Sequence, residues 1–354
     1  MRNIRRMTAA LLILGLVLGA VGCQKTPTAG TPVRDLAIAG STFAEPLYVK
    51  QFDAWYQKTQ VKAVYGPLSS SGAVRAMQDR TIDIGATDVL LTEEEQARLP
   101  ASVLTIPTVL GAVAICVNLT GSPALRMDAA LLSAIFRGDV KTWNDARIAA
   151  LNPMVKLPST PVVVLHRADG SGTTSIFTTY LAAADQTWSS KIGAGSMVAW
   201  PTGVGVKGNA GMAAMIRQTP GSIGYLENTF AVQSSLTTVA LRNRSGAFVV
   251  PDVASIQAAV PADLPADLQG TLLDRPGTGA YPIVSFTWLV FYKEQAYDGR
   301  TRERAVAIYD LVSWIIGDGQ TLAEPLQYSS LPDAVRKKAV SLLQQLTWEG
   351  KPVK

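Results

Sequence analysis

The sequence has little of the side-chain chemistry on which many enzymes and metalloproteins depend. Its 354 residues include one histidine, His166, and two cysteines, Cys23 and Cys116. No His/Cys cluster with the spacing of a zinc site is present. The Gly-Lys-Ser/Thr end of a Walker loop and the Gly-x-Ser-x-Gly spacing of a nucleophile elbow are also missing. These absences argue against a zinc enzyme, a P-loop hydrolase and an α/β-hydrolase, and we expect no metal and no cofactor.

Clustered positive charge is scarce as well. The formal net charge is +5, but Arg2, Arg5 and Arg6 lie in the first 22 residues, which carry no acidic residue. Removal of that segment lowers the charge by three, to +2. No run of Lys or Arg follows, so we expect no nucleic-acid partner.

The N-terminus is typical of an exported protein. Residues 1–6 are basic, residues 9–18 are apolar, and small residues precede Cys23. This pattern resembles the lipobox of bacterial lipoproteins, which implies cleavage before Cys23 and lipidation of its sulfur. The alternative is a plain secretory signal that happens to end near a cysteine. Residues 23–33 then form a polar tether after a signal peptide at residues 1–22.

The remaining chain has the composition of a globular protein that is large enough for two domains. The full sequence is 48% hydrophobic and 17% charged, which excludes a disordered chain. Cys116 lies within an apolar run at residues 111–117. We therefore interpret it as a small buried hydrophobe, and lipidation of Cys23 would leave it without a disulfide partner.

A strand–loop–helix unit occurs three times. In each unit a short apolar run leads through glycine and hydroxyl residues into a helical pattern, at residues 35–56, 61–78 and 161–183. Residues 82–88 add a short strand that ends on Asp88. This alternation predicts an α/β protein with a mostly parallel sheet, in which ligands bind beyond the carboxyl ends of the strands.

The other expected elements extend this sheet. We predict two strands within residues 103–117, separated by Pro107 and Thr108, and a return strand at residues 281–292. Helices are expected at residues 128–136 with Asp128 as N-cap, 212–217 after a glycine-rich loop, 302–316 and 332–346.

The loops of the three units gather groups that suit a small tetrahedral oxyanion. One arginine, Arg167, offers a bidentate partner, and unpaired N–H groups lie at the starts of three helices. An ordinary capped turn is the alternative for each loop, and Asp169 either holds Arg167 or bonds its own backbone. The candidate ligand groups are Thr42, Phe43, Ser70, Asp88, Arg167, Ser171, Gly172 and Thr173.

Asp88 narrows the choice of anion. A carboxylate repels an anion unless the ligand carries a proton that the carboxylate can accept. Phosphate near neutral pH carries such protons and sulfate does not, so Asp88 favours phosphate. The alternative is a strand-end aspartate bonded to the backbone. His166, beside an arginine at a strand end, fits a structural role better than a catalytic one.

Several segments resemble the phosphate-binding proteins of bacterial ABC phosphate importers, the PstS family of periplasmic binding proteins. The resemblance covers about residues 36–346. It rests on four motifs in order, Gly40-Ser41-Thr42-Phe43, Ser70-Ser71-Gly72, Ile84-Gly85-Ala86-Thr87-Asp88 and Arg167-Ala168-Asp169-Gly170-Ser171-Gly172-Thr173. Departures are mild: Ser41 stands where the family often has alanine, Ser69 where glycine is frequent, and His166 where some members have arginine.

The resemblance implies a two-lobed periplasmic-binding-protein fold, type II-like, in which each lobe is a mixed sheet flanked by helices and a hinge joins the lobes. Lobe I would comprise residues 34–110 plus 283–354, and lobe II residues 111–282. The eight candidate groups above would contact phosphate, Phe43 through its backbone N–H. Asp169 would pair with Arg167, and Asp88 would accept the ligand proton.

By the same resemblance the chain is a monomeric solute-binding protein and not an enzyme. It would be extracytoplasmic, on the periplasmic or cell-surface side, and held to the cell membrane by lipid at Cys23. It would deliver inorganic phosphate to the permease of an ABC importer. Two alternatives remain open at this point: a surface phosphate-ester hydrolase that uses Ser171 and His166, and a phosphate sensor that feeds no importer.

Overall fold

The computed structural model describes residues 33, 35–265, 268 and 270–354. Cys23, the expected signal peptide and most of the expected tether lie outside these residues. The strands are β1 (Asp35–Gly40), β2 (Lys62–Pro67), β3 (Ile84–Thr87), β4 (Val103–Val117), β5 (Arg126–Met127), β6 (Val163–Arg167), β7 (Val204–Val206), β8 (Ser222–Glu227), β9 (Thr237–Thr238), β10 (Ala240–Arg242), β11 (Phe248–Val249), β12 (Val284–Tyr292), β13 (Thr347–Trp348) and β14 (Lys351–Pro352).

The helices alternate with these strands in the α/β manner that the sequence predicts. They are α1 (Glu45–Thr59), α2 (Ser70–Gln78), α3 (Glu93–Arg98), α4 (Ala129–Phe136), α5 (Ala146–Leu151), α6 (Gly172–Ala184), α7 (Gln186–Lys191), α8 (Gly208–Gln218), α9 (Asn228–Gln233), α10 (Val253–Ala258), α11 (Arg302–Ile316) and α12 (Asp333–Leu343), with 3-10 turns η1 (Asp318–Leu322) and η2 (Glu324–Leu326).

One sheet runs through both halves of the described chain, in the order β2-β1-β3-β12-β4-β8-β6-β7, with β9 also paired to β4. The pairs β1–β2, β1–β3, β6–β8 and β6–β7 are parallel, as the three strand–loop–helix units predict. Strand β12 is antiparallel to β3 and β4, and β4 is antiparallel to β8, so the sheet is mixed. We call the elements around β1–β3 the first lobe and those around β6–β8 the second lobe.

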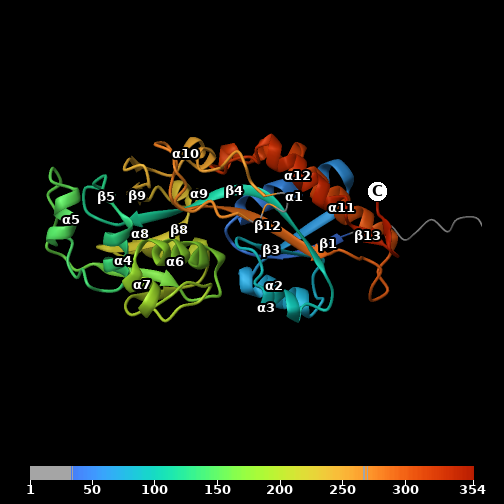
Figure 1. The fold of residues 1–354 in the computed structure, drawn as a ribbon, viewed down its shortest axis with the longest axis horizontal. Coiled ribbons are helices and arrows are strands. Elements are labelled where there is room, and N and C mark those ends of the chain that lie inside the picture. Colours follow the sequence, from blue (N-terminus) through green and yellow to red (C-terminus); the bar gives the residue numbers. More distant parts are fainter. Residues whose placement is uncertain (1–32, 34, 266–267, 269) are drawn as a thin grey trace, which may run out of the picture. The chain divides into compact units, whose positions relative to one another are not determined.

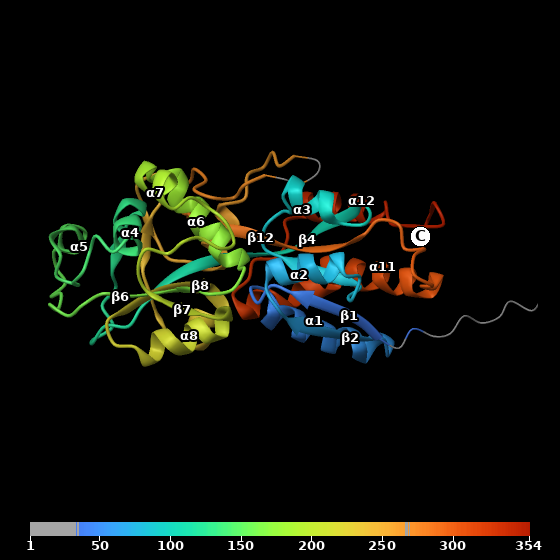
Figure 2. The same cartoon turned by 90° about the horizontal axis from the view of Figure 1, so that it is seen from below.

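Strands β4 and β12 connect the two lobes (Figures 1 and 2). The expected pair of strands within residues 103–117 is wrong: they form the single strand β4. Pro107 is accommodated because it lies opposite Trp288, where the register of β12 shifts between Thr287 and Trp288. A bulge tolerates a residue that lacks an N–H. The residue boundaries proposed for the two lobes stay a prediction.

Two helix starts differ from the predictions. Helix α2, expected to begin at Ala73, begins at Ser70 because the Ser69 side chain accepts a hydrogen bond from the Gly72 N–H. Helix α8 begins at Gly208, four residues earlier than expected, so part of the glycine-rich loop is helical. Asp128 does cap α4, accepting from the Leu131 N–H at 2.9 Å.

The core lies between the sheet and its helices. Helices α11 and α12 pack on β4, in agreement with the expectation that they cover the sheet. Their buried faces carry Ala305, Ile308, Leu311, Val312, Ile315, Val335, Ala339 and Leu343. Cys116 is fully buried in β4, and burial raises the pKa of its thiol to about 12. Among the described residues, no helix has the length and apolarity to cross a bilayer.

Candidate functional site

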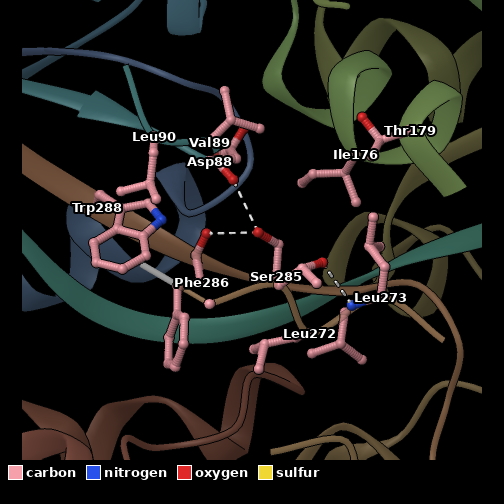
Figure 3. A pocket seen from close by; sticks show the side chains of 13 residues that line it. Asp88, Val89, Leu90, Ile176, Thr179, Leu272, Leu273, Ser285, Phe286 and Trp288 are labelled. Atoms are coloured by element: carbon pink, nitrogen blue, oxygen red, sulfur yellow. Dashed lines mark hydrogen bonds between the residues drawn. The ribbon is translucent and has the colours of Figure 1, made fainter. Parts of the chain in front are cut away.

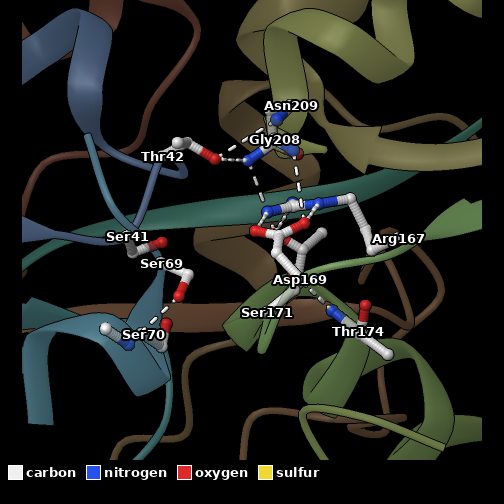
Figure 4. A network of polar contacts seen from close by, with 12 residues as sticks. Ser41, Thr42, Ser69, Ser70, Arg167, Asp169, Ser171, Thr174, Gly208 and Asn209 are labelled. Carbon is white, nitrogen blue, oxygen red and sulfur yellow. Dashed lines mark hydrogen bonds and ion pairs between the residues drawn. The ribbon is translucent and has the colours of Figure 1, made fainter. Parts of the chain in front are cut away.

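The candidate ligand groups follow the carboxyl ends of strands that come from both lobes. Strand β1 ends at Gly40 before α1, β3 ends at Thr87 directly before Asp88, and β6 ends at Arg167 before α6. Figure 4 shows the first-lobe residues Ser41, Thr42 and Ser70 facing second-lobe residues that include Arg167, Asp169 and Asn209. The fold therefore brings together groups that are more than 100 residues apart in the chain.

Arg167 is buried, with 4% of its surface exposed. Its Nε and Nη2 donate to the two oxygens of Asp169 at 2.8 and 2.5 Å. Its Nη1 donates to Thr173 Oγ1 at 3.4 Å, and its backbone N–H donates to the Tyr225 hydroxyl at 3.0 Å. Asp169 thus grips the guanidinium as a fork, which orients Nη1 toward the site.

Asp169 keeps its charge in this pair. Burial alone raises the pKa of a carboxyl group, but the guanidinium of Arg167 and the Gly208 N–H, which donates at 3.2 Å, hold the pKa of Asp169 below its ordinary value. Arg167 and Asp169 therefore form a fixed ion pair rather than two independent charges.

Asp88 is fully buried and accepts hydrogen bonds from three hydroxyls. Ser41 Oγ and Ser70 Oγ (3.4 Å) donate to Oδ2, and Thr287 Oγ1 donates to Oδ1 at 3.3 Å. Burial raises the pKa of Asp88 to about 7, against the opposing effect of these bonds and of Arg167. The group can therefore exchange a proton near neutral pH.

Two residues of strand β12 form hydrogen bonds to Asp88. Ser285 Oγ donates to the Asp88 backbone oxygen at 2.9 Å, and Thr287 on the same strand donates to the carboxylate.

Between these residues and α6 lies a cavity of about 260 Å³ whose walls come from both lobes (Figure 3). Its lining is mostly apolar and includes Val89, Leu90, Ile176, Leu272, Leu273, Phe286 and Trp288.

The two sets of site residues are in direct contact at the start of α6. A Cβ added to Gly172 would lie 2.4 Å from both Asp88 Oδ2 and Ser70 Oγ. Next to it, the Ser71 N–H donates to the Gly170 oxygen at 3.1 Å, and the Ser71 and Ser196 hydroxyls are 3.2 Å apart. Only glycine fits at position 172 in this closed arrangement.

The remaining candidate groups are placed as follows. Ser171 is the N-cap of α6, and its Oγ accepts from the Thr174 N–H at 3.2 Å. Thr173 lies in the first turn of α6, and Ser70 in the first turn of α2. The Phe43 N–H donates to Ser41 Oγ at 3.0 Å, next to Asp88. Thr42 Oγ1 accepts from the side chain of Asn209 at 2.9 Å.

Three residues that were not among the predicted site residues form hydrogen bonds from their side chains to the side chains of these groups: Ser41, Asn209 and Thr287. Asn209 lies in the glycine-rich stretch 203–211, which the sequence does single out as a loop. Ser41 lies inside a predicted motif, between Gly40 and Thr42. Thr287 lies in a strand interior, and no local pattern could have marked it.

His166 is occupied in a structural role. Its ring stacks on Trp200 with centroids 4.8 Å apart and planes at 13°, and its Nδ1 lies 3.1 Å from the Arg167 oxygen. Burial lowers its pKa. Within the described part of the chain no hydrogen bond joins His166 to Ser171. The described residues also contain no group of three or more His, Cys, Asp or Glu that could hold a metal ion.

Comparison with known proteins identifies the family. A model of the PBP superfamily domain matches residues 25–318. The phosphate-binding protein PstS of Methanocaldococcus jannaschii is 35% identical over 94% of this chain and 95% of its own length. PstS of Xylella fastidiosa is 36% identical over 88% of this chain and 86% of its own length. The chain belongs to the PstS family of phosphate-binding proteins.

Solved structures agree on the fold of this PstS family member. A human phosphate binding apolipoprotein matches with a TM-score of 0.70 at 19% identity, over 87% of this chain and 94% of that one. The periplasmic phosphate-binding protein PfluDING, solved with phosphate, matches with a TM-score of 0.69 at 20% identity, over 87% and 93%. The predicted two-lobed periplasmic-binding-protein fold is confirmed.

The raised pKa of Asp88 leads to a prediction about how the stability of the ligand-free protein depends on pH. In the folded protein this pKa is about 7, against an ordinary value of 3.8. The folded state therefore holds one proton more than the unfolded state between about pH 4 and 7, so Asp88 makes stability fall as pH rises through this window. We expect Asp88→Asn to raise the free energy of unfolding at pH 8 by on the order of 2–4 kcal/mol, and by little near pH 4.

Chemical denaturation in phosphate-free buffer at pH 4, 6 and 8 measures this difference. Asp145→Asn serves as the control, because Arg147 lowers the pKa of Asp145 to about 2 and the expected change has the opposite sign. An Asp88→Asn variant whose stability follows the wild-type protein at all three pH values would contradict the prediction.

Proposed function

We propose that this chain captures inorganic phosphate between its two lobes and delivers it to an ABC importer. The observation that carries the proposal is the pairing of a buried guanidinium, Arg167, with a buried carboxyl group of near-neutral pKa, Asp88, across the contact between the lobes. Hydroxyl groups and helix N-termini surround both. Family membership supports the same ligand, because curated relatives that are 33–36% identical are named phosphate-binding proteins.

The charge pattern favours phosphate over other tetrahedral anions. Arg167 attracts the anion and remains fixed by Asp169, while Asp88 needs a ligand that brings its own proton. Arsenate shares the protonation of phosphate, and sulfate has no proton to give. A buried acceptor that meets another acceptor loses a hydrogen bond and adds repulsion, so a site of this kind rejects sulfate.

Titration calorimetry against phosphate, arsenate and sulfate tests the ligand assignment. We expect phosphate and arsenate to bind, and sulfate to bind about 10²–10⁴-fold more weakly. Asp88→Asn is expected to weaken discrimination against sulfate more than it weakens phosphate binding. Tight sulfate binding by the wild-type protein, or no phosphate heat, would refute the assignment. An unchanged preference in the variant would count against a proton-accepting Asp88.

The proposed role is binding without chemistry. Ser171 caps a helix and His166 stacks on Trp200, so the pair that a hydrolase would need is engaged elsewhere. Closure of two lobes on a ligand suffices for delivery. A chromogenic phosphate ester should show no turnover above buffer, and turnover that disappears in His166→Ala would favour the hydrolase instead.

We also propose that lipid on Cys23 anchors the protein to the extracytoplasmic face of the cell membrane and that the protein acts as a monomer beside the permease. The sequence pattern before Cys23 supports this anchor. Cys23→Ser should move the protein from the membrane fraction to the soluble fraction, and mass spectrometry of the wild-type N-terminus should find the lipid.

A further inference from the structure

Asn209 touches both halves of the site without belonging to the predicted ligand set. It is fully buried in the first turn of α8. Its side-chain nitrogen donates to Thr42 Oγ1 of the first lobe at 2.9 Å and to Thr173 Oγ1 of the second at 3.4 Å (Figure 4). Its backbone N–H also donates to Thr42 Oγ1, at 3.2 Å. One residue thus joins the lobes through the hydroxyls of two predicted ligand residues.

The orientation of the Asn209 amide is fixed by its other end. The backbone N–H of Glu227 donates to Asn209 Oδ1 at 3.0 Å. A flipped amide would set its NH₂ group against this N–H, so the nitrogen must face the two threonines. Glu227 is itself held, because its Oε2 accepts from the Thr229 N–H at 2.8 Å and from the Tyr328 hydroxyl at 3.2 Å.

These bonds determine what the threonine hydroxyls can do. A hydroxyl oxygen accepts up to two hydrogen bonds and donates one. Thr42 Oγ1 accepts twice from Asn209. Thr173 Oγ1 accepts from Asn209 Nδ2 and from Arg167 Nη1, both at 3.4 Å. With both acceptor positions used, each hydroxyl can only donate, and a ligand bound between the lobes is the partner that remains for its proton.

We propose that Asn209 is a positioning residue for anion binding: it turns the hydroxyls of Thr42 and Thr173 into obligate donors and ties the lobes together when they close. This inference rests on the proposed function. As a consequence, Asp88 accepts a hydrogen bond from the ligand, whereas the two threonines can only donate hydrogen bonds to it. The site then recognises a ligand with many acceptor oxygens and a single proton to give.

A double-mutant cycle measures the coupling that this arrangement requires. Phosphate affinity and dissociation rate are compared in the wild-type protein, Asn209→Ala, Thr42→Val and the double variant. We expect Asn209→Ala to weaken binding 10–100-fold, mostly through faster dissociation. The phosphate affinity of the double variant should be no more than about threefold below that of the single variant with the lower affinity. The reason is that the Thr42 hydroxyl depends on Asn209 for its orientation.

Asn209→Asp tests the donor argument at constant size. A carboxylate at this position accepts the Thr42 proton, so the hydroxyl turns away from the ligand, and the negative charge repels the anion. We expect a loss of more than 10³-fold in phosphate affinity, well beyond that of Asn209→Ala. Binding by Asn209→Asp that equals or exceeds binding by Asn209→Ala would overturn the proposal.

Asn152→Ala is the matched control, since Asn152 is another buried second-lobe asparagine whose amide bonds Arg126 and Ile148 away from the site. It should lower stability without changing phosphate affinity, whereas Asn209→Ala should change affinity. Additive effects in the cycle, or wild-type affinity in Asn209→Ala, would overturn this inference alone. A wild-type protein that binds no phosphate would overturn it together with the proposed function.

Discussion

Arg167→Gln is expected to lower phosphate affinity by about 10²–10⁴-fold. The guanidinium is buried and is the cation that faces Asp88 across the lobes. Removal of one partner of a buried, hydrogen-bonded charge pair costs about 3–5 kcal/mol, which corresponds to this range. The substitution also leaves Asp169 without its cation beside the anion, which adds repulsion. Titration calorimetry at low ionic strength measures the loss.

Arg147→Gln is the matched control for this experiment. Arg147 pairs with Asp145, also two residues away and also through Nε and Nη2, but both side chains are on the surface. The control changes the net charge of the protein by the same amount and should leave phosphate affinity within about twofold. Arg167→Lys should recover only part of the loss, because an ammonium group cannot grip Asp169 as a fork. Equal effects of the Arg167 and Arg147 substitutions to Gln would contradict the prediction.

Gly172→Ala is expected to block closure and to weaken phosphate binding about 100-fold. The added methyl group would lie 2.4 Å from Asp88 Oδ2 and from Ser70 Oγ, both on the opposite lobe. Overpacking of this kind costs about 3 kcal/mol when backbone elements must move to relieve it. The clash exists only between the lobes, so the ligand-free protein should fold with near wild-type stability.

Small-angle scattering and calorimetry together check this prediction. The wild-type protein should become more compact when phosphate is added, and Gly172→Ala should not. Gly279→Ala is a suitable control, because a Cβ there meets no atom within 4 Å. A Gly172→Ala variant that binds and compacts like the wild-type protein would show that the lobes tolerate the methyl group.

The local part of the site could be predicted from the sequence because it follows from short patterns. Gly/Ser/Thr loops between an apolar strand and a helix place N–H groups and hydroxyls at the carboxyl end of the preceding strand, as Arg167, Ser171 and Thr173 illustrate. The hydrogen bonds of Thr287 to Asp88 and of Asn209 to Thr42 span 199 and 167 positions in the chain. Such pairings depend on the order of the strands in the sheet and on contact between the lobes, and the periodicity of apolar residues along the chain does not encode either of them.

Strand β4 shows a similar limit in the fold. Its Pro107 and Thr108 interrupt an apolar run, which favours two strands when only the local sequence is considered. Thr108 of β4 has no partner in β12 between the pairs Val109–Thr287 and Pro107–Trp288, so β4 carries a bulge beside the proline, and Thr108 Oγ1 donates to the Thr287 oxygen at 3.1 Å. Pairing with β12, a strand distant in the sequence, therefore keeps β4 continuous across Pro107 and Thr108.

The position of β12 in the sheet has a consequence for the order of folding during synthesis. β12 lies between β3 and β4, yet about 170 residues of chain separate it from β4. Until residues 284–292 leave the ribosome, β3 and β4 each expose an unpaired edge, while the elements around β6–β8 are already complete. We expect the second lobe to fold first. The first lobe can complete its sheet only after β12, its central strand, has been synthesised and has paired with strands that are distant in the sequence.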